Sequence, residues 1–215
     1  MLLDLVTVAV IGFVGFRLVS AFRRATKRDA TSLSLQIVRG LRPRHFLPIP
    51  LVLVLVLVTA ALLVQVPGLD FGWWSAIGGE GNAAFGSTER TRGTPLELLI
   101  PLVFVLLLLP ALPLFARREE EIFRLGAEDW SMAKRVLKAI VFGLVHVIVG
   151  IPIGVALALS IGGAWFTLAY MHGYRRGGRA EALMESTRSH TAYNGTIVVL
   201  LLLALAYEVA VELTA

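Results

Sequence analysis

Long apolar stretches separated by short charged segments dominate the chain. Five of them hold roughly 20 or more mainly apolar residues, the length at which a helix crosses a bilayer: 2–22, 46–66, 96–116, 136–171 and 192–211. The fourth stretch is about twice as long as one span needs, so we expect it to turn back near Gly150 and Pro152. The pattern predicts an all-α protein, a polytopic membrane helix bundle with about six transmembrane helices.

Two local features qualify these spans. Arg23 and Arg24 follow the first stretch, which lacks the preceding positive charge and the cleavage site of a signal peptide. We therefore expect a retained anchor rather than a cleaved segment. Pro110 and Pro113 stand near the end of the third stretch, where their missing backbone donors should kink or break the helix.

Basic residues indicate which side of the membrane each connecting segment faces. Arginine and lysine are frequent in three segments, 23–45, 117–138 and 174–189. Segment 67–95 carries only Arg90 and Arg92. Because Lys and Arg collect in cytosolic loops, we expect the three rich segments inside and both chain termini outside.

Composition supports an integral membrane protein. Hydrophobic residues make up 57% of the 215 residues and charged residues 16%, which is more apolar than a soluble domain of this length. The chain has no cysteine, so disulfides, thiolate metal sites and a cysteine nucleophile are excluded. The net charge is +5, and the basic residues cluster beside the apolar stretches. We therefore expect membrane lipid as a partner and no nucleic acid.

Ionisable residues within or beside spans are the candidate chemistry, because such groups are costly in a membrane. The first set is an acidic run that ends the third span. Arg124 follows Glu120 by four residues and Glu121 by three, so it can pair with either across one helical turn. Glu119 points elsewhere, which leaves one carboxylate free to act. Taken alone, this run also fits a solvated helix beside the membrane.

Two further sets lie on later spans. His146 stands in an apolar helix with Phe142 one turn before it, so the ring of Phe142 can pack over the imidazole. His190 and Asn194 open the last span on one helix face and can aim two donors at one point. Each alone also fits a packing or capping residue, but a carboxylate, two imidazoles and an amide together form a hydrolytic set.

In this order, the three sets resemble the signature of the CAAX protease and bacteriocin-processing family, also called CPBP or Abi. Its pattern is EExxxR, then FxxxH, then HxxxN or HxxxD. Here these motifs are Glu119-Glu120 with Arg124, Phe142 with His146, and His190 with Asn194. The register of the first motif is fixed by Arg124, because a start at Glu120 would need arginine at Leu125.

The resemblance covers residues 96–213 and implies an intramembrane endopeptidase similar to type II CAAX prenyl endopeptidases. It implies a catalytic membrane core at 96–215, preceded at 1–95 by two spans with a basic cytosolic loop and an outer loop. The resemblance implies an active site that faces the cytosol and a substrate that is a membrane-associated protein or peptide, prenylated or not. By analogy, the catalytic residues are Glu119, Glu120, His146, His190 and Asn194, supported by Arg124 and Phe142. Glu119 and His146 would activate water, and His190 and Asn194 would stabilise the oxyanion.

Two alternatives stay open at this point. No cofactor is expected from the resemblance, but Glu119, His146 and His190 would also supply three ligands for a catalytic zinc ion. The chain also fits a non-catalytic membrane partner, such as a bacteriocin self-immunity or assembly factor, that keeps the polar residues for packing. Other intramembrane protease motifs are absent from the sequence: there is no H-E-x-x-H, no G-x-S-x-G and no pair of aspartates in a span.

Overall fold

The computed structural model describes residues 12–13, 15–16, 19–23, 26–76, 78–80, 87–88, 93–94 and 96–214. Within these residues the regular secondary structure is helical apart from one small antiparallel pair, β1 (Gly79–Glu80) and β2 (Ser87–Thr88). The α-helices are α2 (Arg28–Arg39), α3 (Pro43–Phe46), α4 (Ile49–Leu63), α5 (Trp73–Ala76), α6 (Leu96–Phe123), α7 (Met132–Leu144), α8 (Ile153–Ala158) and α9 (Ser160–Thr214). Short 3₁₀ helices occupy Ala127–Asp129 and Val145–Val149.

Among the described residues, three stretches are long and apolar enough to cross a membrane: Pro43–Leu63, Leu99–Asp129 and Ile153–Tyr207. Many of their large apolar side chains face outward, such as Leu57 on α4 and Leu203 on α9, as lipid-facing side chains do. The all-α class and the membrane character of the chain are thus supported, whereas a total of six spans is not confirmed. The first expected span, 2–22, lies mostly outside the described residues.

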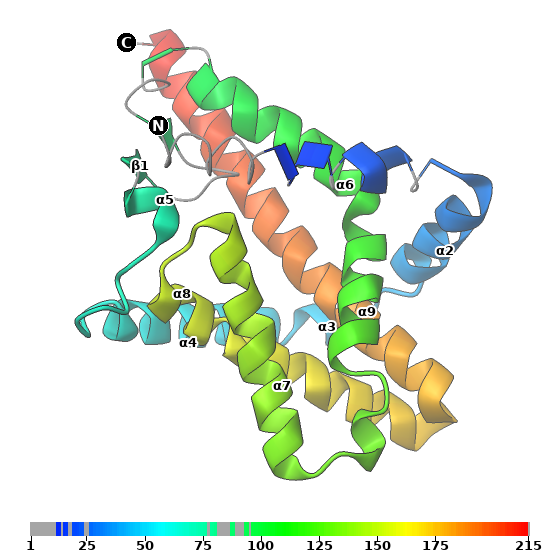
Figure 1. Ribbon diagram of the computed structural model, residues 1–215. Helices are drawn as coiled ribbons and strands as arrows, with labels where there is room; N and C mark the ends of the chain where they lie inside the picture. The colour runs from blue at the N-terminus through cyan, green and yellow to red at the C-terminus, as the bar shows by residue number, and fades with distance from the viewer. Residues whose placement is uncertain are drawn as a thin grey trace.

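Helix α6 is continuous through its prolines. It contains Pro101, Pro110 and Pro113, and it bends partway along its length (Figure 1). The sequence placed the end of this span at residue 116, but the helix continues to Phe123. The prolines therefore bend the helix without breaking it, and the acidic run stays helical.

The expected turn in the fourth stretch lies at Gly150. Helix α7 begins after Ser131, whose hydroxyl accepts a hydrogen bond from the backbone N–H of Lys134, a normal N-cap. Gly150 has φ +91°, and a Cβ atom there would lie 2.6 Å from Cβ of Trp74. Only glycine fits this conformation and this contact, so the chain reverses here into α8.

Helix α9 differs most from the expectation. The sequence predicted a connecting segment at 174–189 and a last span from residue 192, but helix covers nearly all of 160–214. The only non-helical backbone within α9 is at Gly177 and Gly178, the latter with φ +70° and ψ −163°. The chain turns sharply at this pair, so α9 consists of two arms that leave the bend in different directions (Figure 1).

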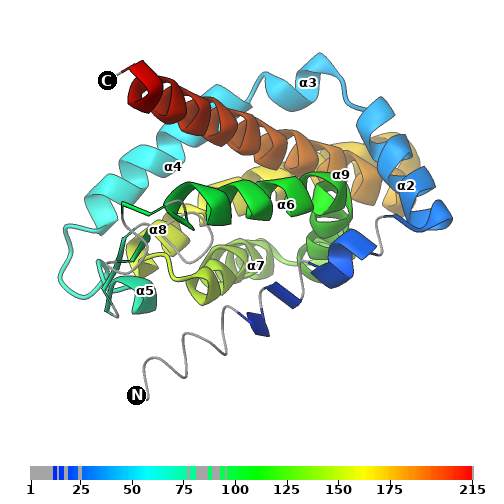
Figure 2. The same cartoon turned by 90° about the horizontal axis from the view of Figure 1, so that it is seen from above.

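The two arms of α9 organise the molecule. Helices α6 and α7 pack against α9, and α4 packs against α8 and α9. The largest core cluster lies where they meet and includes Phe123, Phe142, Phe166 and Tyr193. In both overall views α2 lies towards one end of the molecule, and α5 and the C-terminus lie towards the other (Figures 1 and 2).

Candidate active site

The last turns of α6 separate the three glutamates into three environments. Arg124 Nη1 lies 3.2 Å from Oε1 of Glu120, so the predicted pairing across one turn is correct. Glu121 pairs instead with Arg117 at 3.0 Å and with Arg118 at 3.4 Å, near the surface. Glu119 has no arginine partner within the described residues. The period of the helix thus places Glu120 in the interior, Glu121 near the surface and Glu119 between the two.

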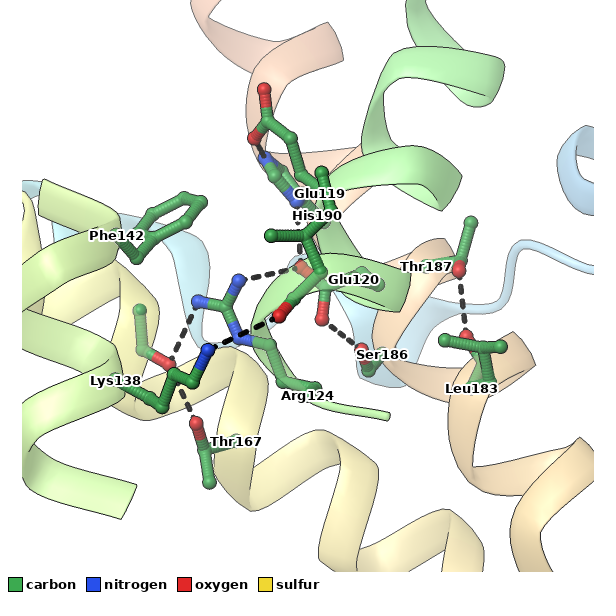
Figure 3. A network of polar contacts seen from close by, with 12 residues as sticks. Glu119, Glu120, Arg124, Lys138, Phe142, Thr167, Leu183, Ser186, Thr187 and His190 are labelled. Atoms are coloured by element: carbon green, nitrogen blue, oxygen red, sulfur yellow. Dashed lines mark hydrogen bonds and ion pairs between the residues drawn. The ribbon is translucent and has the colours of Figure 1, made fainter. Parts of the chain in front are cut away.

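Glu120 is fully buried, and both of its carboxylate oxygens have partners (Figure 3). His190 Nδ1 donates to Oε1 at 2.8 Å, and the hydroxyl of Ser186 donates to Oε2. Arg124, which directly follows α6, completes a set of three side chains around this carboxylate. A buried carboxylate without such partners would be strongly destabilising, and both oxygens of this one are engaged.

Arg124 is buried to the same degree, with 1% of its side chain exposed. Its Nη2 donates to the backbone carbonyl of Gly163 at 3.1 Å, which connects α6 to α9. Its guanidinium carbon lies 4.1 Å from the ring centroid of Phe142, a distance typical of a cation–π contact. The charge therefore has a carboxylate, a carbonyl and an aromatic face as partners in place of water.

His190 lies between the two carboxylates. Its ring stacks on Phe166, with centroids 4.2 Å apart and planes 18° apart. While Nδ1 faces Glu120, Nε2 lies 3.5 Å from Oε2 of Glu119. The side chain of Glu119 is 33% exposed, and its Oε2 has no hydrogen-bond partner among the described residues. Glu119 is thus next to the buried network and still open on one side.

His146 joins this network through Phe142. Its Nδ1 donates to the backbone carbonyl of Phe142 at 2.9 Å, which leaves Nε2 of the neutral ring as a free acceptor. The predicted packing of the two rings is correct, with centroids 5.2 Å apart. Phe142 also lies 5.5 Å from the ring of His190. One phenylalanine therefore touches all three motifs.

Two predicted site residues, His146 and Asn194, form no hydrogen bond to the other predicted catalytic residues in the described structure. No hydrogen bond or ion pair joins His146 to Glu119 within the described part of the chain. Asn194 lies one turn beyond His190 on α9 and is half-buried, and its amide makes no hydrogen bond to any described residue. His190 also lies well inside the second arm of α9, and not at the start of a span as the sequence suggested.

The described residues contain no group of three or more His, Cys, Asp or Glu arranged to hold a metal ion. Glu119, His146 and His190, the ligand set that the sequence allowed for zinc, are among these described residues and do not form such a group. His190 turns its two ring nitrogens towards two carboxylates, and His146 makes its contact with a backbone carbonyl.

Sequence reasoning did not identify three residues that complete the network: Ser186, Gly163 and Phe166. A signal for Ser186 was present, because it precedes His190 by four residues and so lies on the same face of a helix. Gly163 contributes a carbonyl, and its lack of a side chain lets Phe142 and Arg124 approach, since a Cβ there would lie 2.9 Å from the Phe142 ring. Nothing in the sequence pattern distinguishes Phe166 from other apolar core residues.

We compared the chain with protein-family models, with curated proteins and with solved structures, and none of the three comparisons found a match.

Proposed function

We propose that this chain is an intramembrane endopeptidase of the CPBP type. The observation that carries the proposal is the meeting of three motifs, far apart in sequence, in one buried polar centre among apolar helices. Buried charges in a membrane bundle are costly and are typical of functional sites. Glu120 pairs with Arg124 and His190, and the ring of Phe142 lies against both of these side chains. Glu119 lies at the edge of this cluster, next to His190.

In this proposal Glu119 is the general base. It takes a proton from a water molecule as the water oxygen forms a bond to the scissile carbonyl carbon. When the C–N bond breaks, the same proton passes to the leaving nitrogen and Glu119 is restored. Glu119 suits this role better than Glu120, because its side chain is partly exposed. Its Oε2 is buried but has no hydrogen-bond partner among the described residues.

The remaining motif residues assist this step. His146 offers a free Nε2 that would help to hold the water, provided that substrate binding brings it towards Glu119. Asn194 has a free amide and would donate to the oxyanion, where one donor contributes about 3–4 kcal/mol. The resemblance gives His190 the same role, but its Nε2 faces Glu119. We therefore propose that His190 also orients Glu119.

The proposed substrate is a membrane-associated protein or peptide, prenylated or not, that reaches the site from the cytosolic side of a multi-pass protein. The basic residues of α2, of the α6–α7 connection and of the α9 bend support this orientation. Membrane lipid is the expected surrounding partner. No cofactor is invoked, and metal analysis of the purified protein would test the zinc alternative.

The proposal can be tested with a fluorescence-quenched peptide that ends in a prenylated cysteine motif, whose cleavage is measured as an increase in fluorescence. We expect the wild-type protein in detergent to cleave it, Glu119→Gln to abolish cleavage, and Glu121→Gln to retain it. Glu121 is the matched control, because it lies on the same turns but pairs only with surface arginines. Comparison of C-terminal peptides from cell membranes with wild type and Glu119→Gln extends the test to unprenylated substrates. Equal peptide patterns would contradict the proposal.

One observation favours a second function, that of a non-catalytic membrane partner such as a bacteriocin self-immunity or assembly factor. Both carboxylate oxygens of Glu120 have partners among Arg124, Ser186 and His190, as they would in a purely structural polar core. Under this alternative, substitution of Glu119 changes no C-terminal peptide. The experiment above therefore distinguishes the two functions.

A further inference from the structure

We infer that Ser186 is a positioning residue for the proposed reaction, acting through Glu120 on His190. The inference rests on the proposed function and deepens it, because Ser186 belongs to none of the three motifs. Ser186 is fully buried on α9, one turn before His190. Its hydroxyl donates to Oε2 of Glu120, on the opposite side of that carboxylate from His190 (Figure 3).

The first step concerns the carboxylate plane of Glu120. The terminal torsion of a glutamate is soft and has no sharp minima, so contacts at one oxygen alone do not fix the plane. His190 Nδ1 and Arg124 Nη1 both approach Oε1, at 2.8 Å and 3.2 Å. Ser186 provides the only hydrogen bond to Oε2 within the described residues. Its hydroxyl therefore restrains rotation of the carboxylate.

The second step concerns the ring of His190. Stacking on Phe166 fixes the plane of the imidazole, but it does not determine which edge of the ring faces α6. The hydrogen bond from Nδ1 to Glu120 fixes which edge faces α6, and with this orientation Nε2 points to Glu119. A carboxylate that can rotate would hold the ring less firmly. The proposed base, Glu119, would then lose the neighbour that orients it.

Substitution of Ser186 by alanine tests the inference, with Thr187→Val as a matched control. Thr187 is the next residue and is equally buried, but its hydroxyl donates to the backbone carbonyl of Leu183 and does not touch the site. With the quenched prenylated peptide, we expect Ser186→Ala to lower kcat about 10- to 100-fold, as misplaced catalytic groups do, with little change in KM. Thr187→Val should retain wild-type kcat.

A second readout does not depend on activity. The chain has only 4 histidines, so ¹⁵N-histidine spectra in detergent can be assigned by single substitutions, with His190→Gln identifying the signal of interest. We expect Ser186→Ala to shift the His190 ring nitrogens and Thr187→Val to leave them in place. If the wild type cleaves nothing, the proposed function fails, while the spectra still decide the role of Ser186.

Two results would overturn the inference. One is a Ser186→Ala protein with wild-type His190 signals. The other is an equal loss of stability and signal in Ser186→Ala and Thr187→Val, which would make the hydroxyl a general packing feature. Should the alanine variant fail to fold, Ser186→Cys keeps the side-chain size with a weaker donor, and it must then show the same shift of His190.

Discussion

Glu119 and Glu120 are neighbours in sequence with opposite surroundings, and this contrast gives the sharpest test at the residue scale. Glu120→Gln leaves the guanidinium of Arg124 buried without its counter-charge. We expect this to cost about 3 kcal/mol or more of stability, visible as a lower melting temperature in detergent. The stability of Glu119→Gln should lie within about 0.5 kcal/mol of wild type, since Glu119 is partly exposed and its one ion-pair contact among the described residues, to His190, is 3.5 Å long. Equal destabilisation by both substitutions would favour a purely structural role for the motif.

Asn194 offers a complementary case, because its amide has no hydrogen-bond partner among the described residues. Asn194→Ala should therefore leave the melting temperature unchanged. If the amide donates to the oxyanion, the same variant should lose about 100-fold or more in kcat with little effect on KM. Steady-state kinetics with the quenched peptide measure both constants. A change confined to KM would assign Asn194 to substrate binding.

Sequence reasoning succeeded at this scale for two pairs of residues that are four positions apart in the chain. The pair of Glu120 with Arg124 and the packing of Phe142 on His146 follow from the helical period alone. The contacts of Glu120 with Ser186 and His190 join residues 66 and 70 positions apart. Contacts of this kind depend on how α6 and α9 pack against each other, which no local pattern specifies.

At the scale of the element, the bend of α9 depends on Gly178. Its φ of +70° with ψ of −163° is a backbone region that only glycine occupies readily. Gly178→Ala should cost about 1–3 kcal/mol of stability. Gly195→Ala is the control, because a Cβ atom there meets nothing within 4 Å and alanine is the better helix former. Thermal unfolding of the two variants should therefore show opposite shifts, and a neutral Gly178→Ala would contradict the argument.

A second element-scale prediction concerns the contact between α3 and α9. Arg44 donates to both carboxylate oxygens of Glu185, at 2.8 Å and 2.9 Å, and Glu185 is 4% exposed. We expect Glu185→Gln to cost about 2 kcal/mol, since charge-assisted hydrogen bonds are the stronger ones. The double variant with Arg44→Gln should cost clearly less than the sum of the two single changes. Additive losses would show that the pair is not coupled.

The elements were predicted in part. Long apolar runs gave the positions of α4, α6 and the turn at Gly150 because length and glycine placement are local signals. The bend of α9 was missed because the charged residues around Gly177 and Gly178 suggested a loop. Residues 179–191 are nevertheless helical, and the run Ala180, Glu181, Ala182, Leu183 and Met184 consists of strong helix formers. The basic residues indicate which side of the membrane a segment faces, but they do not indicate whether the segment is helical or a loop.

At the scale of the whole molecule, the charge pattern and the fold can be tested together. The basic segments include α2 and the bend of α9, and the overall views place α2 and α5 towards opposite ends (Figures 1 and 2). In the proposed orientation the end with α2 faces the cytosol. The absence of native cysteine means that any introduced thiol is the only one in the chain.

Single cysteines at Thr26, Arg176 and Ser87 therefore report the topology directly. At the bend of α9 the cysteine replaces Arg176 and not the neighbouring Gly177, because a Cβ atom at Gly177 would lie 2.9 Å from the side chain of Glu181. A thiol reagent applied from the cytosolic side of inverted vesicles should label positions 26 and 176, which are exposed, but not position 87. The same reagent applied to intact cells should label only position 87. Cytosolic labelling at position 87 would reverse the assigned orientation. Glu119 lies near the end of α6 that leads to the basic α6–α7 connection, so this result would also place the candidate site at the outer face.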